Sequence, residues 1–272
     1  MNGDLGVWAY ALTEDDADHD ISWVTGVAGA TVRATRAGNL TVLVSDVDLA
    51  EFGEVALRRN LEDLTWLETV ARAHHHVIDA ASRLFPLLPM RLATVYTSDE
   101  SMASVLGAHR EDLLDALRRV GGRVEWGVKA YAVPEAEQEH AVSVDSAAAE
   151  SADRGAGLAY LKRRKAQLSA REKSWRSALE GARAVHAHLS ALAAATKLHP
   201  PQSQQLSGNQ RPMMLNAAYL LDADAGTGFA LQVAAAAGAH HELELDLTGP
   251  WPPYSFTADD GEEGPPLTGQ DG

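Results

Sequence analysis

Alternating apolar and polar residues mark the strands of this chain, and apolar residues at three-to-four spacing mark its helices. The alternation predicts strands over residues 123–133 and 242–248, and apolar runs predict strands over 6–12, 87–97 and 213–221. A hairpin is expected over 30–44, because Gly38-Asn39 is a tight-turn pair between two apolar stretches. Helical spacing predicts helices over residues 49–57, 61–84, 97–120, 154–197 and 227–239. Of these, 97–120 should start at a capping box on Thr97 and bend at Gly107.

This order of elements predicts an α+β protein with two domains. Residues 1–133 should form an N-terminal α/β sandwich of ferredoxin-like type, with 87–97 as its central strand. Residues 134–153 are acidic and rich in Ala and Ser, which is typical of a linker. Residues 154–256 should form a C-terminal domain, a small β-sheet packed with a long basic helix, and 257–272 a disordered acidic tail.

The last predicted strand runs into an aromatic and proline-rich segment, which we call the clasp. Two consecutive prolines fix the backbone near polyproline II, and the aromatic rings around them are costly to leave in water. The clasp is therefore expected to fold back onto a domain, and its removal to expose the edge of the second sheet. It carries no nucleophile–base pair and no ligand set, so its expected role is structural. Its signature residues are Gly249, Pro250, Trp251, Pro252, Pro253, Tyr254 and Phe256.

Charge is distributed unevenly in a chain whose net charge is −15. The predicted helix over 154–197 holds ten basic and two acidic residues, whereas 134–153 and 257–272 hold only acidic ones. Either this is a solvated face that pairs with the acidic linker, or it is a site for a partner. The overall negative charge favours an acidic protein surface over nucleic acid as that partner. The candidate partner-binding residues are Lys162, Arg163, Arg164, Lys165, Arg171 and Arg176.

Motifs for catalysis or for cofactor binding are missing from the sequence. The chain has no cysteine, no phosphate-binding glycine loop and no G-x-S-x-G elbow. His74, His75 and His76 are adjacent, so on a helix they point about 100° apart and cannot share one ion. His74 is instead expected on the buried face. We therefore expect no cofactor, no metal, no catalytic residue and, without a long apolar run, no membrane span.

Four segments together resemble the GvpL/GvpF family of gas vesicle proteins. The clasp with its approach, residues 247–256 (LTGPWPPYSF), resembles the C-terminal signature of that family. Residues 88–96 (LPMRLATVY) resemble its central strand, and 124–129 (VEWGVK) resemble its E-x-G-V-K strand. Residues 157–164 (GLAYLKRR) resemble the start of its long helix. The four segments occur in the family's order and span roughly residues 5–256.

The resemblance implies a cytoplasmic, non-enzymatic protein of gas vesicle assembly. Such a protein is expected to be a minor vesicle component that binds the small hydrophobic shell protein, and other accessory proteins, and prevents shell-protein aggregation during nucleation. It implies no catalytic residues, and the motifs do not separate the GvpF-like from the GvpL-like branch. Three alternatives stay open: a nucleic-acid binder or a general adaptor acting through the basic helix, and an enzyme whose site is assembled only in three dimensions.

Overall fold

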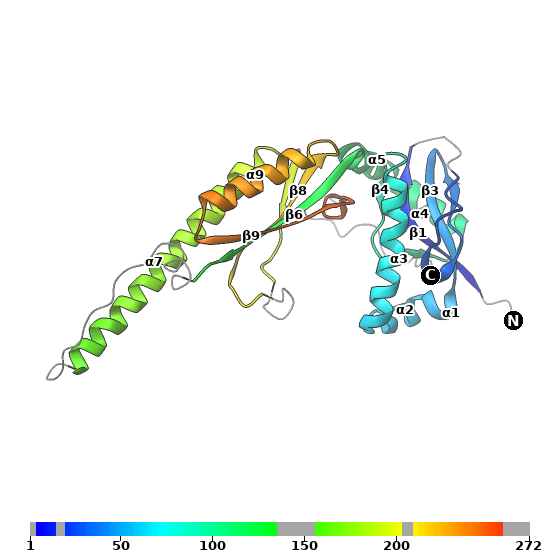
Figure 1. Ribbon diagram of the computed structural model, residues 1–272. Helices are drawn as coiled ribbons and strands as arrows, with labels where there is room; N and C mark the ends of the chain where they lie inside the picture. Colours follow the sequence, from blue (N-terminus) through cyan, green and yellow to red (C-terminus); the bar gives the residue numbers. More distant parts are fainter. Residues whose placement is uncertain (1–3, 15–19, 135–155, 203–208, 258–272) are drawn as a thin grey trace. The chain divides into compact units, whose positions relative to one another are not determined.

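The structure is a computed structural model of residues 1–272 that describes residues 4–14, 20–134, 156–202 and 209–257. The chain forms two compact units, shown in Figure 1. The first unit comprises residues 1–125 together with the stretch that begins at Pro250, and the second comprises residues 126–249. Within the described residues the strands form two sheets that helices cover, so the predicted α+β class is confirmed.

The first sheet is built around strand β1 (Leu5–Thr13), and its strand order is β2-β3-β1-β4. β1 pairs antiparallel with β3 (Leu40–Asp48), and β3 pairs with β2 (Arg33–Ala37) through the predicted hairpin turn. Gly38 in this turn has φ 66°, a left-handed conformation that glycine adopts without strain. The order is that of a ferredoxin-like sheet, except that a loop with a short 3₁₀ helix (Val27–Gly29) connects β1 to β2.

The strand predicted over 87–97 differs from expectation in position and in continuity. It lies at the edge of the sheet, and it is split into β4 (Leu88–Pro89) and β5 (Val95–Tyr96), which both pair with β1. A turn separates the two pieces, and Ala93 within it has φ 67°. The turn forms because the Thr94 amide donates to the Arg91 carbonyl at 3.3 Å, which takes the chain out of the ladder.

The helices of the first unit follow the predicted order but are shorter. Gly53 is extended (φ −69°, ψ 159°) and divides the first predicted helix, and His109 divides the third, two residues after the predicted bend. The capping residue of that third helix is Ser98, not Thr97, because the Ser98 hydroxyl accepts the Ser101 amide at 3.1 Å. The observed helices are α1 (Leu49–Phe52), α2 (Glu54–Asn60), α3 (Leu64–Ser82), α4 (Asp99–Ala108) and α5 (Arg110–Val120).

His74 of α3 is part of the core of the first unit, as the sequence predicted. Its side chain is 2% exposed, and its ring stacks on Tyr10 of β1. The Trp8 indole donates to His74 Nδ1 at 2.9 Å, so the neutral ring carries its proton on Nε2 and donates it to the Met90 carbonyl at 3.2 Å. Burial lowers the pKa of His74 to about 4, with a smaller contribution from the charge of His75.

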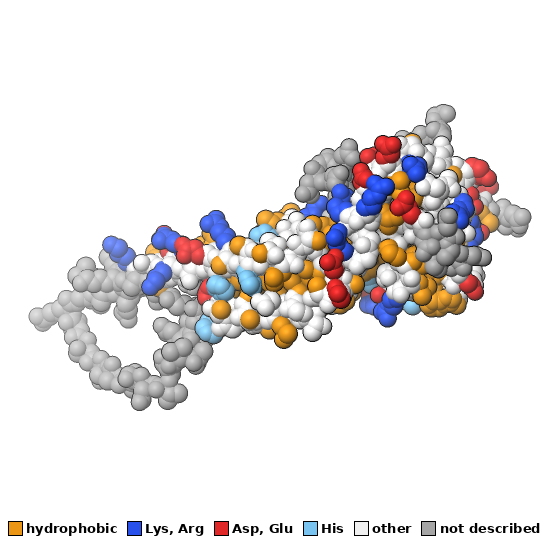
Figure 2. Space-filling view, turned by 90° about the horizontal axis from the view of Figure 1, so that it is seen from above, with side chains coloured by type: hydrophobic (Ala, Val, Ile, Leu, Met, Phe, Trp, Pro, Cys, Tyr) orange, Lys and Arg blue, Asp and Glu red, His pale blue; other side chains and the backbone are white. Residues whose placement is uncertain are grey.

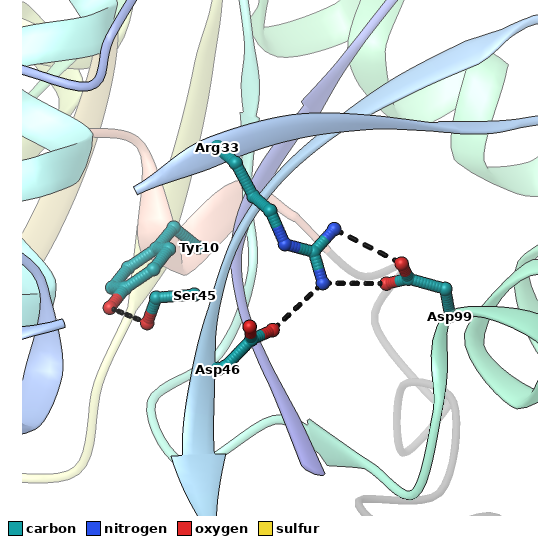
Figure 3. Close-up of polar contacts among 5 residues, drawn as sticks. All are labelled: Tyr10, Arg33, Ser45, Asp46 and Asp99. Atoms are coloured by element: carbon teal, nitrogen blue, oxygen red, sulfur yellow. Dashed lines mark hydrogen bonds and ion pairs between the residues drawn. The ribbon is translucent and has the colours of Figure 1, made fainter. Parts of the chain in front are cut away.

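An ion-paired arginine joins α4 to the sheet (Figure 3). The Arg33 guanidinium on β2 donates to both carboxylate oxygens of Asp99, the first residue of α4, at 3.1 Å each. It also donates to Asp46 of β3 at 2.9 Å. Tyr10 and Ser45 share a buried hydrogen bond of 2.7 Å nearby in the same view. These contacts fix helices and loops onto the sheet and leave no free nucleophile in this group.

The second sheet has the order β7-β8-β6-β9, and two of its strands correct the sequence interpretation. β6 (Arg123–Ala132) was predicted in the first domain, but it pairs between β8 (Met213–Asp222) and β9 (Leu243–Trp251). β7 (Ala195–Leu198) was predicted as the end of the long helix. The strand β6 was predicted but assigned to the wrong sheet, and β7 was not predicted as a strand, because strand partners are set by tertiary contacts, which local periodicity does not encode. The predicted linker and tail lie almost wholly outside the described residues.

Helices α7 (Ala156–Ser190) and α9 (Gly226–Ala239) pack on the second sheet. Small residues on α7 allow the close approach. A Cβ added at Gly181 would lie 2.3 Å from Glu242 Oε1, so a larger residue there would require the Glu242 side chain to move. The core of this unit consists of Val128, Ala130, Ala178, Ala182, Val185, Leu189, Leu215, Ala217, Tyr219, Leu221, Phe229, Val233 and Leu243.

The clasp belongs to the first unit, which corrects the expectation that it completes the second. Tyr254 packs against the core of the first unit and against His75 of α3, with ring centroids 6.2 Å apart. The backbone amide and hydroxyl of Ser255 donate to the two carboxylate oxygens of Glu125 at 2.8 and 2.7 Å. Phe256 is buried, and its carbonyl accepts from Arg119 of α5. Polar and apolar contacts together therefore hold residues 254–256 to the first unit.

We predict that stability of the first unit decreases between pH 6.5 and pH 4 because of His74. Its pKa is lower in the folded chain than in the unfolded chain, so unfolding takes up a proton as the pH falls through this window. The loss at pH 4 should be about 3 kcal/mol. Urea unfolding of the wild type and of His74→Gln at several pH values measures it. Gln offers the same acceptor and donor without titrating, so its slope should be shallower. Equal slopes would contradict the assignment.

We also predict that truncation after Gly249 destabilises the first unit and not the second sheet. Hydrogen exchange should show lost protection in α3 and α5, with β8 unchanged. As a single change, Phe256→Ala should cost about 3 kcal/mol, because Phe256 is buried. Trp251→Ala is the matched control and should cost less than about 1 kcal/mol, because Trp251 is 45% exposed. Loss of protection confined to β8 and β9 would contradict this assignment.

Candidate protein-interaction site

Helix α7 is longer than the sheet on which it packs. Its buried positions begin at Ala178 and continue through Ala182, Val185 and Leu189, where the helix lies on β6 and β8. The N-terminal part of α7 projects past the ends of the strands (Figure 1). We call the described part of this projection, residues 164–176, the helical arm.

The face of the arm that continues the core-facing stripe is apolar and cationic. Arg164, Leu168, Arg171 and Trp175 follow one another at spacings of three or four residues and so lie on one side of the helix. Leu168 is 58% exposed and Trp175 is 51% exposed. Burying a Leu or Trp side chain typically contributes about 2 kcal/mol or more, so this face is a candidate surface for a partner.

A groove opens between the arm and the end of the sheet. Its volume is about 450 Å³, and Ala170, Arg171, Ser174 and Trp175 of α7 form one wall. Segments distant in sequence form the other wall, namely Ala132, Val133, Pro134 and Pro212. The described lining is mostly apolar, and among the described residues that line the groove the charged one is Arg171. The groove can therefore bury one or two apolar side chains of a partner beside a cation.

The cations of the arm are exposed and mostly unneutralised among the described residues. Arg176 forms an ion pair of 3.1 Å with Glu172 one turn before it. Arg164, Lys165, Arg171 and Lys173 are exposed and make no ion pair with another described side chain. Figure 2 shows Lys and Arg side chains predominating along this stretch, with an acidic side chain among them. The arm thus combines positive charge with exposed apolar surface.

Of the residues predicted from sequence for partner binding, four lie on the arm and two lie in the turns of α7 before it. Arg164, Lys165, Arg171 and Arg176 lie on the arm, and Arg171 also lines the groove. Lys162 and Arg163 belong to α7, but their side chains lie outside the described residues. Partner binding by this set stays a prediction. No local signal in the sequence connects Trp175 to Val133 or Pro212, which lie across the groove from it.

The polar clusters of the second unit fit structural roles better than catalysis. His186 on α7 lies 2.9 Å from the Tyr219 hydroxyl and 3.4 Å from Ser190 Oγ, both measured to Nδ1. Burial raises the pKa of Tyr219, so its hydroxyl stays protonated and hydrogen-bonded to His186 Nδ1. The same nitrogen is therefore already bonded and is not available as a base for Ser190. Among the described residues no group of acidic residues and histidines is arranged to hold a metal ion.

Of the signature residues of the clasp, Gly249 is the last residue of the second unit, and those from Pro250 onward belong to the first unit. Pro252 and Pro253 are buried, and Trp251 contacts His75 with ring centroids 5.6 Å apart. Gly249 has φ 123°, so a side chain at this position would be strained. The burial of Pro252 and Pro253 fits the structural role expected from the sequence, and that role stays a prediction. In the described part of the chain, no helix is both long enough and apolar enough to cross a bilayer.

Comparison with known sequences identifies relatives over nearly the whole chain. The sequence model of the family described as gas vesicle synthesis protein GvpL/GvpF matches residues 6–258. Gas vesicle protein L of Streptomyces sp. (strain CB03234) is 39% identical over 256 residues, which cover 94% of each chain. Gas vesicle protein F of the same organism is 30% identical, with 83% of this chain and 87% of the relative covered.

Solved structures share the fold at lower sequence identity. The crystal structure of the gas vesicle protein GvpF from Anabaena sp. PCC7120 superimposes with a TM-score of 0.64 at 19% identity, covering 94% of this chain and 97% of that one. The GvpF structure from Microcystis aeruginosa gives a TM-score of 0.61 at 16% identity, covering 93% and 99%. Identities this low establish a common fold only.

Proposed function

Because the chain belongs to the gas vesicle synthesis protein GvpL/GvpF family, we propose that it is a non-enzymatic assembly protein of gas vesicles. In this proposal it is a minor vesicle component that acts in the cytoplasm and on the growing vesicle. It binds the small hydrophobic shell protein and prevents its aggregation during nucleation. The match of the family to residues 6–258, together with 39% identity to a gas vesicle protein L, is the observation that carries it.

The architecture supports a binding role. A protein that assembles through apolar surfaces aggregates unless those surfaces are covered until they are used. The second unit offers surfaces suited to this task, namely the edge strand β9 and the apolar groove beside the helical arm. The charged face of the arm suits contacts with other accessory proteins of the vesicle.

The first test removes the protein from a cell that makes gas vesicles. Deletion of the gene should leave vesicles absent or few in electron micrographs, because shell protein would aggregate before nucleation. Expression of the gene from a plasmid should restore them. A deletion strain with a normal number and shape of vesicles would refute the assembly role.

The second test concerns the arm. The double substitution Arg164→Glu, Lys165→Glu should reduce copurification of the shell protein or of an accessory protein by about tenfold, since it reverses two exposed charges on a binding face. The control is Arg183→Glu, an exposed cation of the same helix outside the arm. Recovery of partners should be compared by quantitative mass spectrometry, with circular dichroism to verify the fold. Unchanged recovery in the double variant would remove the arm from the binding surface.

A further inference from the structure

We propose that the groove beside the helical arm binds an acidic, amphipathic helix of a partner protein. This inference rests on the proposed function for its biological setting and names the class of partner for one of its surfaces.

The core-facing side of α7 continues beyond the sheet without a described partner. Ala178 is 1% exposed, whereas Trp175, less than one turn earlier, is 51% exposed. One turn of helix separates Trp175 from Arg171, and two turns separate it from Leu168. A second helix lying along this face would extend the helix packing of the core by two to three turns. Exposed Trp and Arg residues near a pocket are the types that most often dominate binding energy.

The groove selects an apolar anchor on the incoming helix. Its walls come from Trp175 and Ala170 on one side and from Val133, Pro134 and Pro212 on the other. These side chains offer no charge and few hydrogen bonds, so a leucine or phenylalanine side chain would fill the space best. Prolines on the far wall carry no backbone N–H, which leaves fewer unsatisfied polar groups when water is displaced.

The charge around the groove selects acidic residues beside that anchor. Arg171 lines the groove, and Arg164, Lys165 and Lys173 lie within two turns of it, all exposed. Glu172 is the acidic residue of the arm, and it pairs with Arg176. An acidic helix would place carboxylates opposite these cations, whereas a basic helix would be repelled. The chain as a whole carries a charge of −15, so the arm is a local positive region. An acidic partner helix would be attracted to the arm and repelled by the rest of the surface.

Purified full-length protein and two synthetic peptides test this inference. One peptide is a 20-residue helix of glutamate, alanine and leucine with the leucines on one face, and the other has lysine in place of glutamate. Fluorescence anisotropy of the labelled peptides measures binding. The acidic peptide should bind and the basic peptide should not. Raising the salt concentration from 50 to 500 mM should lower the affinity for the acidic peptide by about tenfold or more.

Variants locate the binding at the groove. Trp175→Ala and Arg171→Glu should each lower the affinity for the acidic peptide by about tenfold. Both residues are exposed, so the fold should persist. The matched control is Leu231→Ala on α9, because Leu231 is a similarly exposed apolar residue (66%) of the same unit. Equal binding of the two peptides, or unchanged affinity in Trp175→Ala, would overturn the proposal.

A last variant separates a partner from the chain's own acidic residues. It carries Glu135→Gln, Glu137→Gln, Glu139→Gln and Asp145→Asn. If the peptide binds only to this variant and not to the wild type, the chain occupies its own groove, and the partner proposal is wrong. Because the assay uses no vesicle protein, its failure leaves the assembly role standing. Conversely, vesicles in the deletion strain would refute the assembly role and leave the measured affinity standing.

Discussion

The Glu125 carboxylate accepts two hydrogen bonds from Ser255, and the organisation of the chain depends on this contact. Glu125 is the last residue of the first unit before the second begins, and Ser255 lies five residues after the chain returns to the first unit at Pro250. The second unit is therefore an insertion whose two connections are joined at one carboxylate. Charge-assisted hydrogen bonds are stronger than neutral ones. This link therefore suits the position where the chain leaves the first unit after Glu125 and returns to it at Pro250. Tyr254 and Phe256 then add apolar burial to it.

The second unit contains a helix, α7, that is longer than the sheet on which it packs. α7 packs through Ala178 and the small residues that follow, and its earlier turns extend past the strands as the helical arm. A helix that is longer than its sheet exposes part of its apolar side, and in α7 the exposed residues are Leu168 and Trp175. Surface of this kind is uncommon in proteins that act alone, and it fits a protein whose role is to hold other proteins. The cations interspersed on the stripe give that surface charge selectivity as well.

The two units differ in how far their polar and charged side chains are bonded within the unit. In the first, His74, Tyr10 and Arg33 hold helices to the sheet through buried or multiply bonded groups, and their bonding capacity is largely used within the unit. In the second, the core consists of many small residues, and the groove and the arm keep apolar and charged groups exposed. Both units belong to a protein of the gas vesicle family, and the groove and the helical arm lie entirely in the second unit.

The sequence by itself determined the family, the α+β class, the order of most elements and the burial of His74. These follow from local periodicity, from turn residues such as Gly38 and from motifs read along the chain. Only the tertiary structure decided that β6 pairs in the second sheet, that the clasp serves the first unit, and that Trp175 is exposed beside Pro212. The physical reason is that period and propensity report which face of an element is apolar. Which other segment covers that face, or leaves it open, depends on contacts between residues far apart in the chain.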